Sequence, residues 1–457
     1  MVEDVKPSSL MLYNSHMKPP ANHPTPHIDL NDQFQRALDM MEHSSRNIFI
    51  TGRAGTGKST LLEYFRNITT KKVAVLAPTG VAALNVHGQT IHSFFGFKPD
   101  ITLEKVKKRR SNPTVPNIYQ KLDMIIIDEI SMVRADLLDC VDKFLRLNGR
   151  DIDAPFGGLQ MIFIGDLYQL PPVINSTERE SYDSIYRTPY FYGSRAFNDF
   201  KMEFIELEKV YRQQDSNFIH ILNAIRNNSV EDEDLESLNR RYLPDFEPVP
   251  GDFYIYLTTT NAMARQINES ELAKLDTESY NFTAEIQGKF GNEYMPTATE
   301  LQVKVGAQIM MLNNDTAGRW VNGSVGRVTA IIPRVKETVI EAELGEGEVV
   351  EIKPFTWKIY RFFVDGGGLQ SEAMGSFTQY PLMLAWAVTI HKSQGKTFEK
   401  VIVDMGRGAF ACGQTYVALS RCTSLEGIVL KKPILKRHVI TDKGIEDFLA
   451  SFPRARK

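Results

Sequence analysis

Eight residues in the first part of the chain have the spacing of a phosphate-binding loop. Residues 52–59 read GRAGTGKS, and they lie between an apolar run, NIFI, and a segment with helical spacing. Glycines let backbone N–H groups approach phosphate oxygens, and the N-terminus of a helix favours anions. The pattern therefore predicts a nucleoside triphosphate site, with Lys58 on the β- and γ-phosphates and the Ser59 hydroxyl on Mg²⁺. The residues expected to hold the nucleotide are Gly52, Ala54, Gly55, Thr56, Gly57, Lys58, Ser59 and Thr60.

Acidic and amide side chains follow two further apolar runs. Asp128 and Glu129 come directly after the run MIII, and carboxylate oxygens suit Mg²⁺, which keeps several water ligands. We expect Asp128 to hold Mg²⁺ through water and Glu129 to orient the attacking water. Asp166 and Gln169 follow the later run MIFI, where the γ-phosphate would lie. A glutamine amide can contact a water and a phosphate oxygen together, so Gln169 is suited to sensing hydrolysis.

Two arginines are candidates for stabilising charge on the transferred phosphoryl group. Arg212 lies in VYRQ and Arg421 ends YVALSR, much later in the chain. An arginine in this role neutralises developing charge with a planar, multidentate group. If Arg421 comes from a second domain, hydrolysis requires the two domains to close on the nucleotide.

Several loops combine hydroxyl groups, backbone N–H groups, His and Lys. This inventory suits contacts to a phosphodiester backbone without reading of bases. Pro78 and Thr79 are expected DNA contacts from the first of these loops. Phe94 in the second is either a platform for stacking bases or an ordinary core residue. The loops are 77–80, 90–95, 258–261 and 389–397.

The fold class expected from the apolar runs is α/β with parallel sheets. Buried runs separated by helical segments at 47–50, 73–76, 124–127 and 161–164 favour a parallel sheet with helices on both faces. A second αβ segment follows. The region between its halves is rich in short alternating runs, and Asn322-Gly323 is a hairpin signal, which predicts an inserted β-barrel.

The expected domain boundaries follow from these differences in sequence pattern. The boundaries are a mobile leader at 1–27, a first domain at 28–213, a second domain at 214–280 and 384–457, and the inserted barrel at 281–383. The basic segment 98–117, with Lys105 and Arg110, is expected to be an insertion that acts as a wedge or, equally, forms a solvated helix.

Composition sets outer limits. The chain has 457 residues with 42% hydrophobic and 24% charged residues and a net charge of −3, so about two to four domains are expected and any nucleic-acid site must be a local basic channel. Three cysteines in no metal-like spacing indicate neither a disulfide framework nor a zinc site. No apolar run approaches a membrane span and no signal pattern is visible, which suggests a cytoplasmic location, associated with a bacterial nucleoid, without membrane partners.

The motifs resemble, in order, those of superfamily-one helicases. They are similar in detail to the PIF (petite integration frequency) DNA helicases, most specifically DEISMVRADL at 128–137, PFGG at 155–158 and LQVKVGAQ at 301–308. The resemblance covers about residues 30–429. It implies two RecA-like P-loop domains with ATP between them, a wedge insertion in the first and a Src-homology-three-like barrel in the second.

The resemblance also implies an activity and further site residues. It implies an ATP- and Mg²⁺-dependent motor that moves 5′ to 3′ on single-stranded DNA and unwinds forked or tailed duplexes. The family also acts on G-quadruplexes and RNA–DNA hybrids, and we expect a monomer to be active. Gln33 is expected to read adenine, and Gln394 and Gly395 to contact the nucleotide. The positions expected to hold the DNA backbone are His92, Asn261, His391 and Ser393.

Two competing functions are weighed against the helicase. A non-translocating P-loop ATPase, acting as a switch or loader, explains the P-loop and Asp128-Glu129 but not residues 389–397 or Arg421. The helicase part of a relaxase or transposon protein would bring a nuclease-type His or carboxylate cluster, and the sequence has no such cluster.

Overall fold

A computed structural model describes most of the chain. The described residues are 30–109, 117–174, 177–315, 317–335, 337–345, 347–365, 368–406, 408–409 and 411–452. The predicted leader at 1–27 and part of the basic segment, including Arg110, lie outside them.

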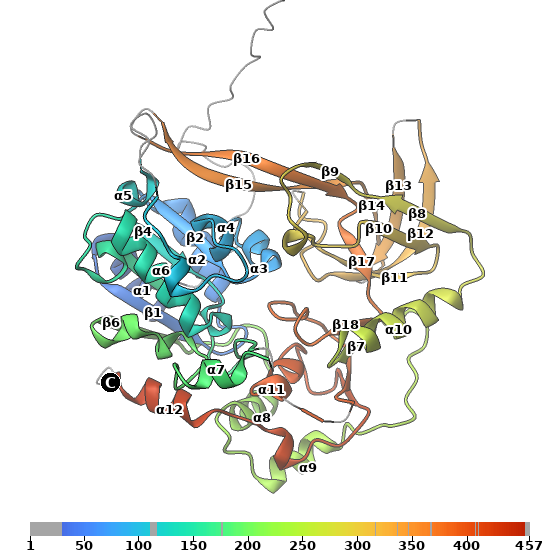
Figure 1. Cartoon of the computed structure of the whole chain (residues 1–457). Helices are drawn as coiled ribbons and strands as arrows, with labels where there is room; N and C mark the ends of the chain where they lie inside the picture. Colours follow the sequence, from blue (N-terminus) through green and yellow to red (C-terminus); the bar gives the residue numbers. More distant parts are fainter. Residues whose placement is uncertain are drawn as a thin grey trace, which may run out of the picture.

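The first domain is built on a six-stranded parallel sheet, as predicted (Figure 1). Its strand order is β3-β2-β4-β5-β1-β6, and every pairing is parallel. In such an order the carboxyl ends of the strands meet at one edge, where loops can form a site. The strands are β1 (Asn47–Gly52), β2 (Val73–Ala77), β3 (Gln89–Thr90), β4 (Met124–Ile127), β5 (Gln160–Ile164) and β6 (Met202–Leu207).

Helices cover both faces of this sheet. Ile48 and Ile50 pack against α1 (Asp32–His43) and α2 (Lys58–Ile68) on one face, whereas Phe49 contributes to the core on the other. Strand side chains alternate between faces, so an uninterrupted apolar run is what a sheet buried on both sides requires. The other helices of this domain are α3 (Gly80–Asn85), α4 (Ile91–Phe95), α5 (Ile118–Lys121), α6 (Ala135–Asn148) and α7 (Arg179–Asp183), with 3-10 turns at Leu103–Lys105, Ile130–Met132, Pro155–Gly158, Phe191–Gly193 and Arg195–Asn198.

The second domain has a four-stranded parallel sheet of order β18-β7-β19-β20. Its strands come from both sides of the insertion in the chain. The strand β7 (Ile255–Thr258) precedes the insertion and pairs with β18 (Ala387–Thr389) and β19 (Val401–Asp404), which follow it. The last strand, β20 (Ile428–Leu430), pairs with β19. The second parallel sheet confirms the predicted fold class. Its helices are α8 (Ser216–Arg226), α9 (Asp232–Asn239), α10 (Asn261–Ala273) and α11 (Gln414–Leu419), with a 3-10 turn at Lys436–His438.

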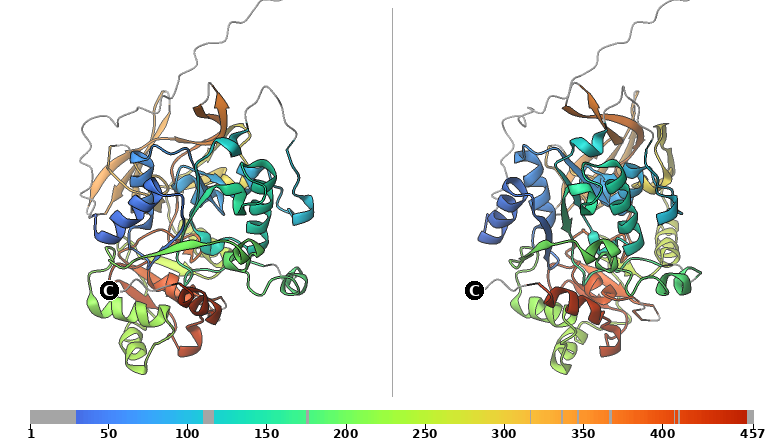
Figure 2. Two further views of the ribbon diagram at one scale, coloured as in Figure 1. Left: turned by 90° about the vertical axis from the view of Figure 1, so that its left-hand side faces the viewer. Right: turned by 60° about the vertical axis from the view of Figure 1, so that its left-hand side comes forward.

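The last helix, α12 (Lys443–Ala450), packs on the first domain rather than on the second. Ile445 is buried in the first-domain core, and the Phe448 ring stacks on Tyr192 at 4.2 Å. The assignment of all residues from 384 to 457 to the second domain is therefore wrong for this helix. The apolar face of a helix can pack on any apolar surface that is left uncovered. Sequence periodicity therefore does not say which domain such a helix covers. Figure 2 shows α12, in dark red, beside the green first-domain segments.

An antiparallel β module lies between α10 and β18. A five-stranded sheet of order β14-β13-β12-β11-β17 and a two-stranded sheet of β10 and β8 share one buried core that includes Leu301, Ile309 and Ile340. The strands of these two sheets are β8 (Ser279–Thr283), β10 (Glu300–Lys304), β11 (Gln308–Met311), β12 (Val325–Pro333), β13 (Thr338–Leu344), β14 (Glu348–Ile352) and β17 (Leu382–Leu384).

Asn322-Gly323 forms a tight turn, but not the two-residue hairpin loop that the sequence suggested. Ser324 N donates to Val321 O at 2.9 Å and Gly323 has a φ of 103°, as position i+2 of a type II turn requires. The turn ends a longer loop that joins the antiparallel strands β11 and β12. The hairpin pairing was thus predicted correctly, but its loop length was not.

A long hairpin crosses from the β module to the first domain. It consists of β15 (Phe355–Asp365) and β16 (Gly368–Gln379), with β9 (Glu285–Gly288) on the β16 edge and the turn Asn292–Tyr294 nearby. Figure 1 shows this orange ribbon reaching over the blue strands. The Tyr294 hydroxyl lies 2.7 Å from Thr90 Oγ1, and Gln89 Nε2 donates to Tyr360 O. The β module therefore rests on the first domain through direct polar contacts.

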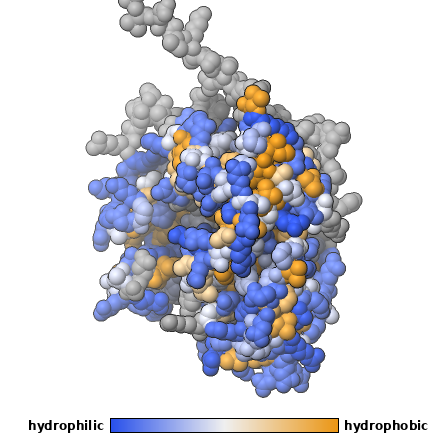
Figure 3. All heavy atoms as spheres, turned by 90° about the vertical axis from the view of Figure 1, so that its right-hand side faces the viewer, coloured by the Kyte–Doolittle hydropathy of each residue, from blue (hydrophilic) through white to orange (hydrophobic). Residues whose placement is uncertain are grey.

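The surface of the β-module side is mostly hydrophilic, with small separate hydrophobic patches (Figure 3). Within the described part of the chain, every helix is too short or too polar to pass through a lipid bilayer.

Candidate nucleotide and DNA site

The phosphate-binding loop joins β1 to α2, as its sequence predicted. Gly55 and Gly57 have φ values of 79° and 86°, a backbone region that residues other than glycine rarely adopt. A Cβ on Gly55 would lie 2.4 Å from Arg212 Cβ, so only glycine allows the loop to approach Arg212 this closely. The loop thus presents backbone N–H groups at the start of a helix, which is an anion site.

Lys58 lies at the base of this loop. Its Nζ donates to Gly52 O at 2.7 Å and to Arg53 O at 3.0 Å. Burial lowers the pKa of Lys58, while the nearby carboxylates of Asp166 and Glu129 act in the opposite direction. A lysine held among these groups is placed to meet phosphate oxygens.

Asp128 and Glu129 follow β4 at the same sheet edge. Burial, and then the neighbouring Glu129 carboxylate, raise the pKa of Asp128 to about 7, and burial also raises the pKa of Glu129. Two crowded carboxylates favour a nearby cation. Asp128 and the exposed Ser59 at the start of α2 supply oxygen donors, which fits Mg²⁺ with water completing its shell. Among the described residues no cluster of three or more His, Cys, Asp or Glu side chains could hold a metal by itself.

Gln394 of the second domain contacts two first-domain residues of the site. Its Nε2 donates to Glu129 Oε2 at 3.0 Å and to Gln169 Oε1 at 3.2 Å. Gln169 Nε2 in turn donates to Asp166 Oδ2 at 3.3 Å. The two domains are therefore joined by side-chain hydrogen bonds at the carboxylate expected to orient water.

Both predicted arginines lie at this interface. Arg212 Nη1 donates to Ser420 O at 3.0 Å, directly beside Arg421. Arg421 is 1% exposed, and its Nη1 donates to Ser393 O and Lys396 O at 3.5 and 3.3 Å. Burial and the Arg212 charge lower the pKa of Arg421 to about 9. Backbone carbonyls of the 389–397 loop thus hold this guanidinium near Glu129.

Two interface residues received no role from the sequence. The Tyr416 hydroxyl accepts from Ala54 N at 2.9 Å, and Arg226 Nη2 donates to Asp166 Oδ1 at 3.2 Å. A signal for Arg226 was present, because it continues the apolar face of α8 formed by Phe218 and Leu222, and a charge on such a face needs a buried partner.

Gln33, expected to read adenine, pairs with one residue of the interdomain segment. Its Nε2 donates to Glu208 Oε2 and its Oε1 accepts from Glu208 N, each at 3.0 Å. Asn31, the cap of α1, donates to Tyr211 OH at 3.2 Å. The start of α1 thus lies against the segment that leads to Arg212. Gly395, the other expected nucleotide contact of the second domain, is exposed with a φ of 78°.

The expected DNA contacts differ in accessibility. Thr79 and Asn261 are exposed, and Pro78, His92 and His391 are partly buried. Burial lowers the pKa of His391, so the neutral ring is favoured. These side chains stand at the starts of helices or in loops of both domains, where a strand could meet them.

Two of the expected DNA contacts have no accessible side chain. Phe94 is 7% exposed, and its ring meets Phe95 and Tyr119 edge to face. The core alternative therefore describes Phe94, and the stacking role is corrected. The Ser393 side chain is fully buried and its hydroxyl donates to Ile390 O at 2.8 Å, so only its backbone could face a strand. An apolar run alone does not distinguish a core aromatic from a stacking one.

Two parallel sheets, with a phosphate loop and opposing arginines at their interface, define a two-domain P-loop NTPase. Residues 30–236 match the PIF1-like helicase family. The ATP-dependent DNA helicase Pif1 of Bdellovibrio bacteriovorus is 32% identical over 94% of this chain and 93% of its own length. The chain therefore belongs to the PIF1-like helicase family, which confirms the resemblance of its motifs.

Solved structures agree with this membership. Bacteroides Pif1 in complex with ADP-AlF4 is 36% identical, with a TM-score of 0.84 over 92% of this chain and 96% of that one. Bacteroides Pif1 bound to single-stranded DNA is 37% identical, with a TM-score of 0.66 over the same shares. Unliganded Bacteroides Pif1 has a TM-score of 0.83, so this chain is more similar to the unliganded and ADP-AlF4 structures than to the one bound to single-stranded DNA.

Proposed function

We propose that this protein is an ATP-dependent DNA helicase that moves 5′ to 3′ along single-stranded DNA and unwinds duplexes ahead of it. The observation that carries the proposal is the position of Gln394. This side chain joins Glu129 and Gln169 at the nucleotide site, and it belongs to the same loop as His391. A strand gripped at His391 would therefore act on the group that orients the attacking water.

We propose a role for each residue at the nucleotide site, and the geometry described above supports these roles. The loop at 52–59 and Lys58 would bind the phosphates, Gln33 the base, and Ser59 with Asp128 the Mg²⁺. Mg²⁺ supplies neutralisation of phosphate charge. Glu129 would orient the attacking water, and Arg212 and Arg421 would stabilise charge on the γ-phosphoryl group. Since Arg421 lies on the second domain, hydrolysis would require both domains together.

DNA would lie along loops of both domains. Pro78, Thr79 and His92 in the first domain, and Asn261 and His391 in the second, would hold the sugar–phosphate backbone. Contacts of this kind tolerate any sequence and weaken with salt. Alternate grip by the two domains, driven by closure on ATP and opening after hydrolysis, would move the strand.

The polarity, the active monomer and the wider substrates are part of the same proposal. The comparison proteins include Bacteroides Pif1 bound to single-stranded DNA, which supports a single strand as the track. We propose that forked and 5′-tailed duplexes are unwound by one copy, that G-quadruplexes and RNA–DNA hybrids are further substrates, and that the work takes place in the cytoplasm.

ATP turnover with and without single-stranded DNA tests the proposal, together with two duplexes that carry a 5′ or a 3′ tail. Strong stimulation and unwinding from the 5′ tail alone are expected. Turnover that ignores DNA would favour a switch or loader ATPase instead, and unwinding from the 3′ tail would reverse the polarity. A rate per protein that is independent of protein concentration would support the monomer.

A further inference from the structure

A buried arginine of the second domain contacts the first-domain loop that carries Gln169. Arg226 is the last residue of α8, and 4% of its surface is exposed. Its Nη2 donates to Asp166 Oδ1 at 3.2 Å, and the guanidinium lies 4.3 Å from the centroid of the Tyr168 ring. Glu206 Oε1 is 3.9 Å from the same Nη2. Removal of one partner from such a pair leaves an uncompensated buried charge, so Arg226 and Asp166 depend on each other.

The carboxylate of Asp166 also determines how Gln169 is oriented. Asp166 is 1% exposed, and Gln169 Nε2 donates to its Oδ2 at 3.3 Å. A carboxylate accepts but does not donate, so the amide nitrogen of Gln169 must face Asp166 and the amide oxygen must face away. That oxygen accepts from Gln394 Nε2 at 3.2 Å. The orientation of one amide thus links Asp166 to Gln394.

The second domain holds this loop from two sides. A Cβ on Gly413, which precedes α11, would lie 2.3 Å from Tyr168 O and 2.5 Å from Gln169 O. Arg226 meets the same loop from α8 through Asp166 and the Tyr168 ring. The Arg226 Nε is buried and has no hydrogen-bond partner among the described residues. A buried donor without a partner costs stability, so the Arg226–Asp166 contact is not the arrangement that stability alone would favour.

We propose that Arg226 is a positioning residue of the ATPase cycle, which pairs with Asp166 across the domain interface and fixes the Gln169 amide toward Gln394 and the γ-phosphate. The inference rests on the proposed function. Because Arg226 and Asp166 belong to different domains, Arg226 holds the carboxylate that orients this amide only while α8 is docked. Arg226 therefore makes the orientation of Gln169 depend on domain closure, without touching the nucleotide itself.

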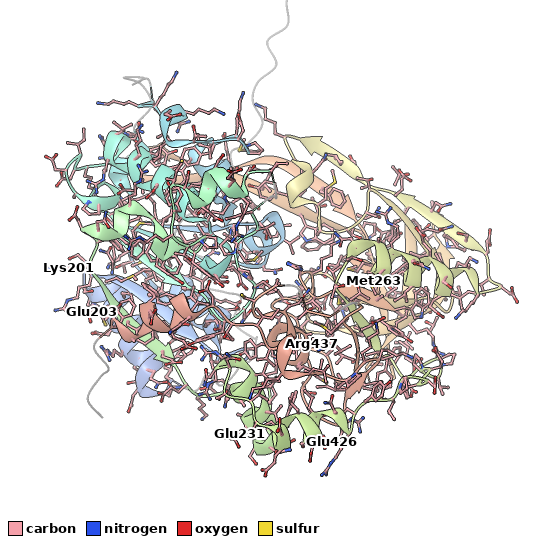
Figure 4. The ribbon with its side chains drawn as sticks, turned by 60° about the horizontal axis from the view of Figure 1, so that its bottom comes forward. Lys201, Glu203, Glu231, Met263, Glu426 and Arg437 are labelled. Carbon is pink, nitrogen blue, oxygen red and sulfur yellow. The ribbon has the colours of Figure 1, made fainter. Side chains whose placement is uncertain are left out.

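Two substitutions and a matched control test this role. Arg226→Gln removes the charge, and Arg226→Lys keeps the charge but loses the planar fork. Arg241→Gln is the control, because Arg241 donates to Glu426 O and Ile428 O inside the second domain. Figure 4 shows Glu426 at the outer edge, far from Lys201 and Glu203 of the first domain. The control thus disturbs the same domain away from the interface.

The kinetic expectation separates positioning from a structural role. Arg226→Gln should lower kcat of DNA-stimulated ATP turnover about tenfold or more, while the Kd for a non-hydrolysable ATP analogue changes less than about threefold. Arg226→Lys should fall between Arg226→Gln and the unsubstituted protein, and Arg241→Gln should keep kcat within about twofold. Unchanged kcat for Arg226→Gln, or parallel loss of kcat and analogue affinity, would overturn the inference.

Hydrogen exchange gives a readout that does not depend on turnover. Without nucleotide or DNA, Arg226→Gln should speed amide exchange in residues 165–170 relative to Arg241→Gln, and adding Asp166→Asn should give little further change. Exchange in that loop equal to that of the control would contradict the role. If the unsubstituted protein shows no DNA-stimulated turnover, the proposed function fails, whereas normal stimulation with an unaffected Arg226→Gln variant defeats only this inference.

Discussion

Gln394 of the second domain donates a hydrogen bond of 3.0 Å to the carboxylate of Glu129 in the first. Glu129 is the group that we propose orients the attacking water, and Gln394 is three residues from His391 in a loop that would grip DNA. A displacement of that loop would move the amide and free or realign the carboxylate. In the proposed function, this one hydrogen bond would couple DNA binding to ATP hydrolysis.

Gln394→Ala should reduce the stimulation of ATP turnover by single-stranded DNA. The substitution removes the donor to Glu129 and to Gln169, so the two domains lose their side-chain link at the site. We expect kcat at saturating DNA to fall about tenfold, measured by steady-state turnover over a range of DNA concentrations. Arg241→Gln, a change inside the second domain away from the interface and from this loop, is the control. Full stimulation in the Gln394 variant would show that the contact does not transmit DNA binding.

Glu129→Gln should bind ATP but hydrolyse it slowly. The amide keeps the size and hydrogen bonding of the side chain but cannot accept a proton from water, so kcat should fall by roughly 10²–10³-fold. Single-turnover measurement of bound ATP, with filter binding for affinity, checks both parts. Hydrolysis near the unsubstituted rate would assign the orientation of the water to another group.

Lys58→Ala should abolish turnover and weaken ATP binding. Lys58 Nζ now bonds the loop carbonyls of Gly52 and Arg53, and no other described lysine lies in this loop. We expect a loss of more than about 100-fold in kcat/KM. Lys71→Ala is a matched control, since Lys71 Nζ bonds Met41 O and Gln160 Oε1 away from the interface. Substantial residual turnover would refute the phosphate-binding assignment.

Lys396→Met should stabilise the protein near pH 7, and the gain should disappear toward pH 10. Burial lowers the pKa of Lys396 to about 8, so the folded state binds the proton less tightly than the unfolded state does. The unfolded state then carries more protons between about pH 8 and 10.5, and stability rises with pH across that window. At pH 7 the buried charge of Lys396 therefore lowers the free energy of unfolding by the full amount that corresponds to the pKa difference between the two states. The substitution removes this cost.

The size of this gain is limited by a lost contact. Lys396 Nζ donates to Asn322 Oδ1 at 2.5 Å, and Asn322 Nδ2 donates to Asn85 Oδ1 at 3.0 Å, which joins the loop to the β module and the first domain. We expect a net gain of about 1–2 kcal/mol in the free energy of unfolding at pH 7. Urea unfolding at pH 7 and pH 10 measures it, with Lys392→Met as control. An equal effect at both pH values would exclude the buried charge as its cause.

The sequence predicted features that depend on neighbours along the chain. The phosphate loop and the apolar strands before Asp128 and Asp166 are local patterns, and each forms as expected. The parallel sheets follow from alternation of such strands with helices. The site residues that stand at strand ends were therefore predictable, because topology brings those ends to one edge.

Features that depend on how domains dock were not predictable. Arg226 and Tyr416 are distant in the chain from Asp166 and Ala54, and only the docked interface pairs them. Phe94 was ambiguous for a related reason, since an aromatic residue packs equally well on a core or a base until its neighbours are known. No pattern in the sequence indicated that the hairpin of β15 and β16 would rest on the first domain.

The placement of α12 has a consequence for how the protein is made. Phe448 of this last helix packs on Phe49 and Phe191, aromatic residues that leave the ribosome long before it does. The first sheet can therefore assemble early during translation, as N-terminal domains generally do, but this aromatic surface stays uncovered until α12 emerges. The first domain is therefore completed only after the second domain has been synthesised, when α12 packs on its aromatic residues.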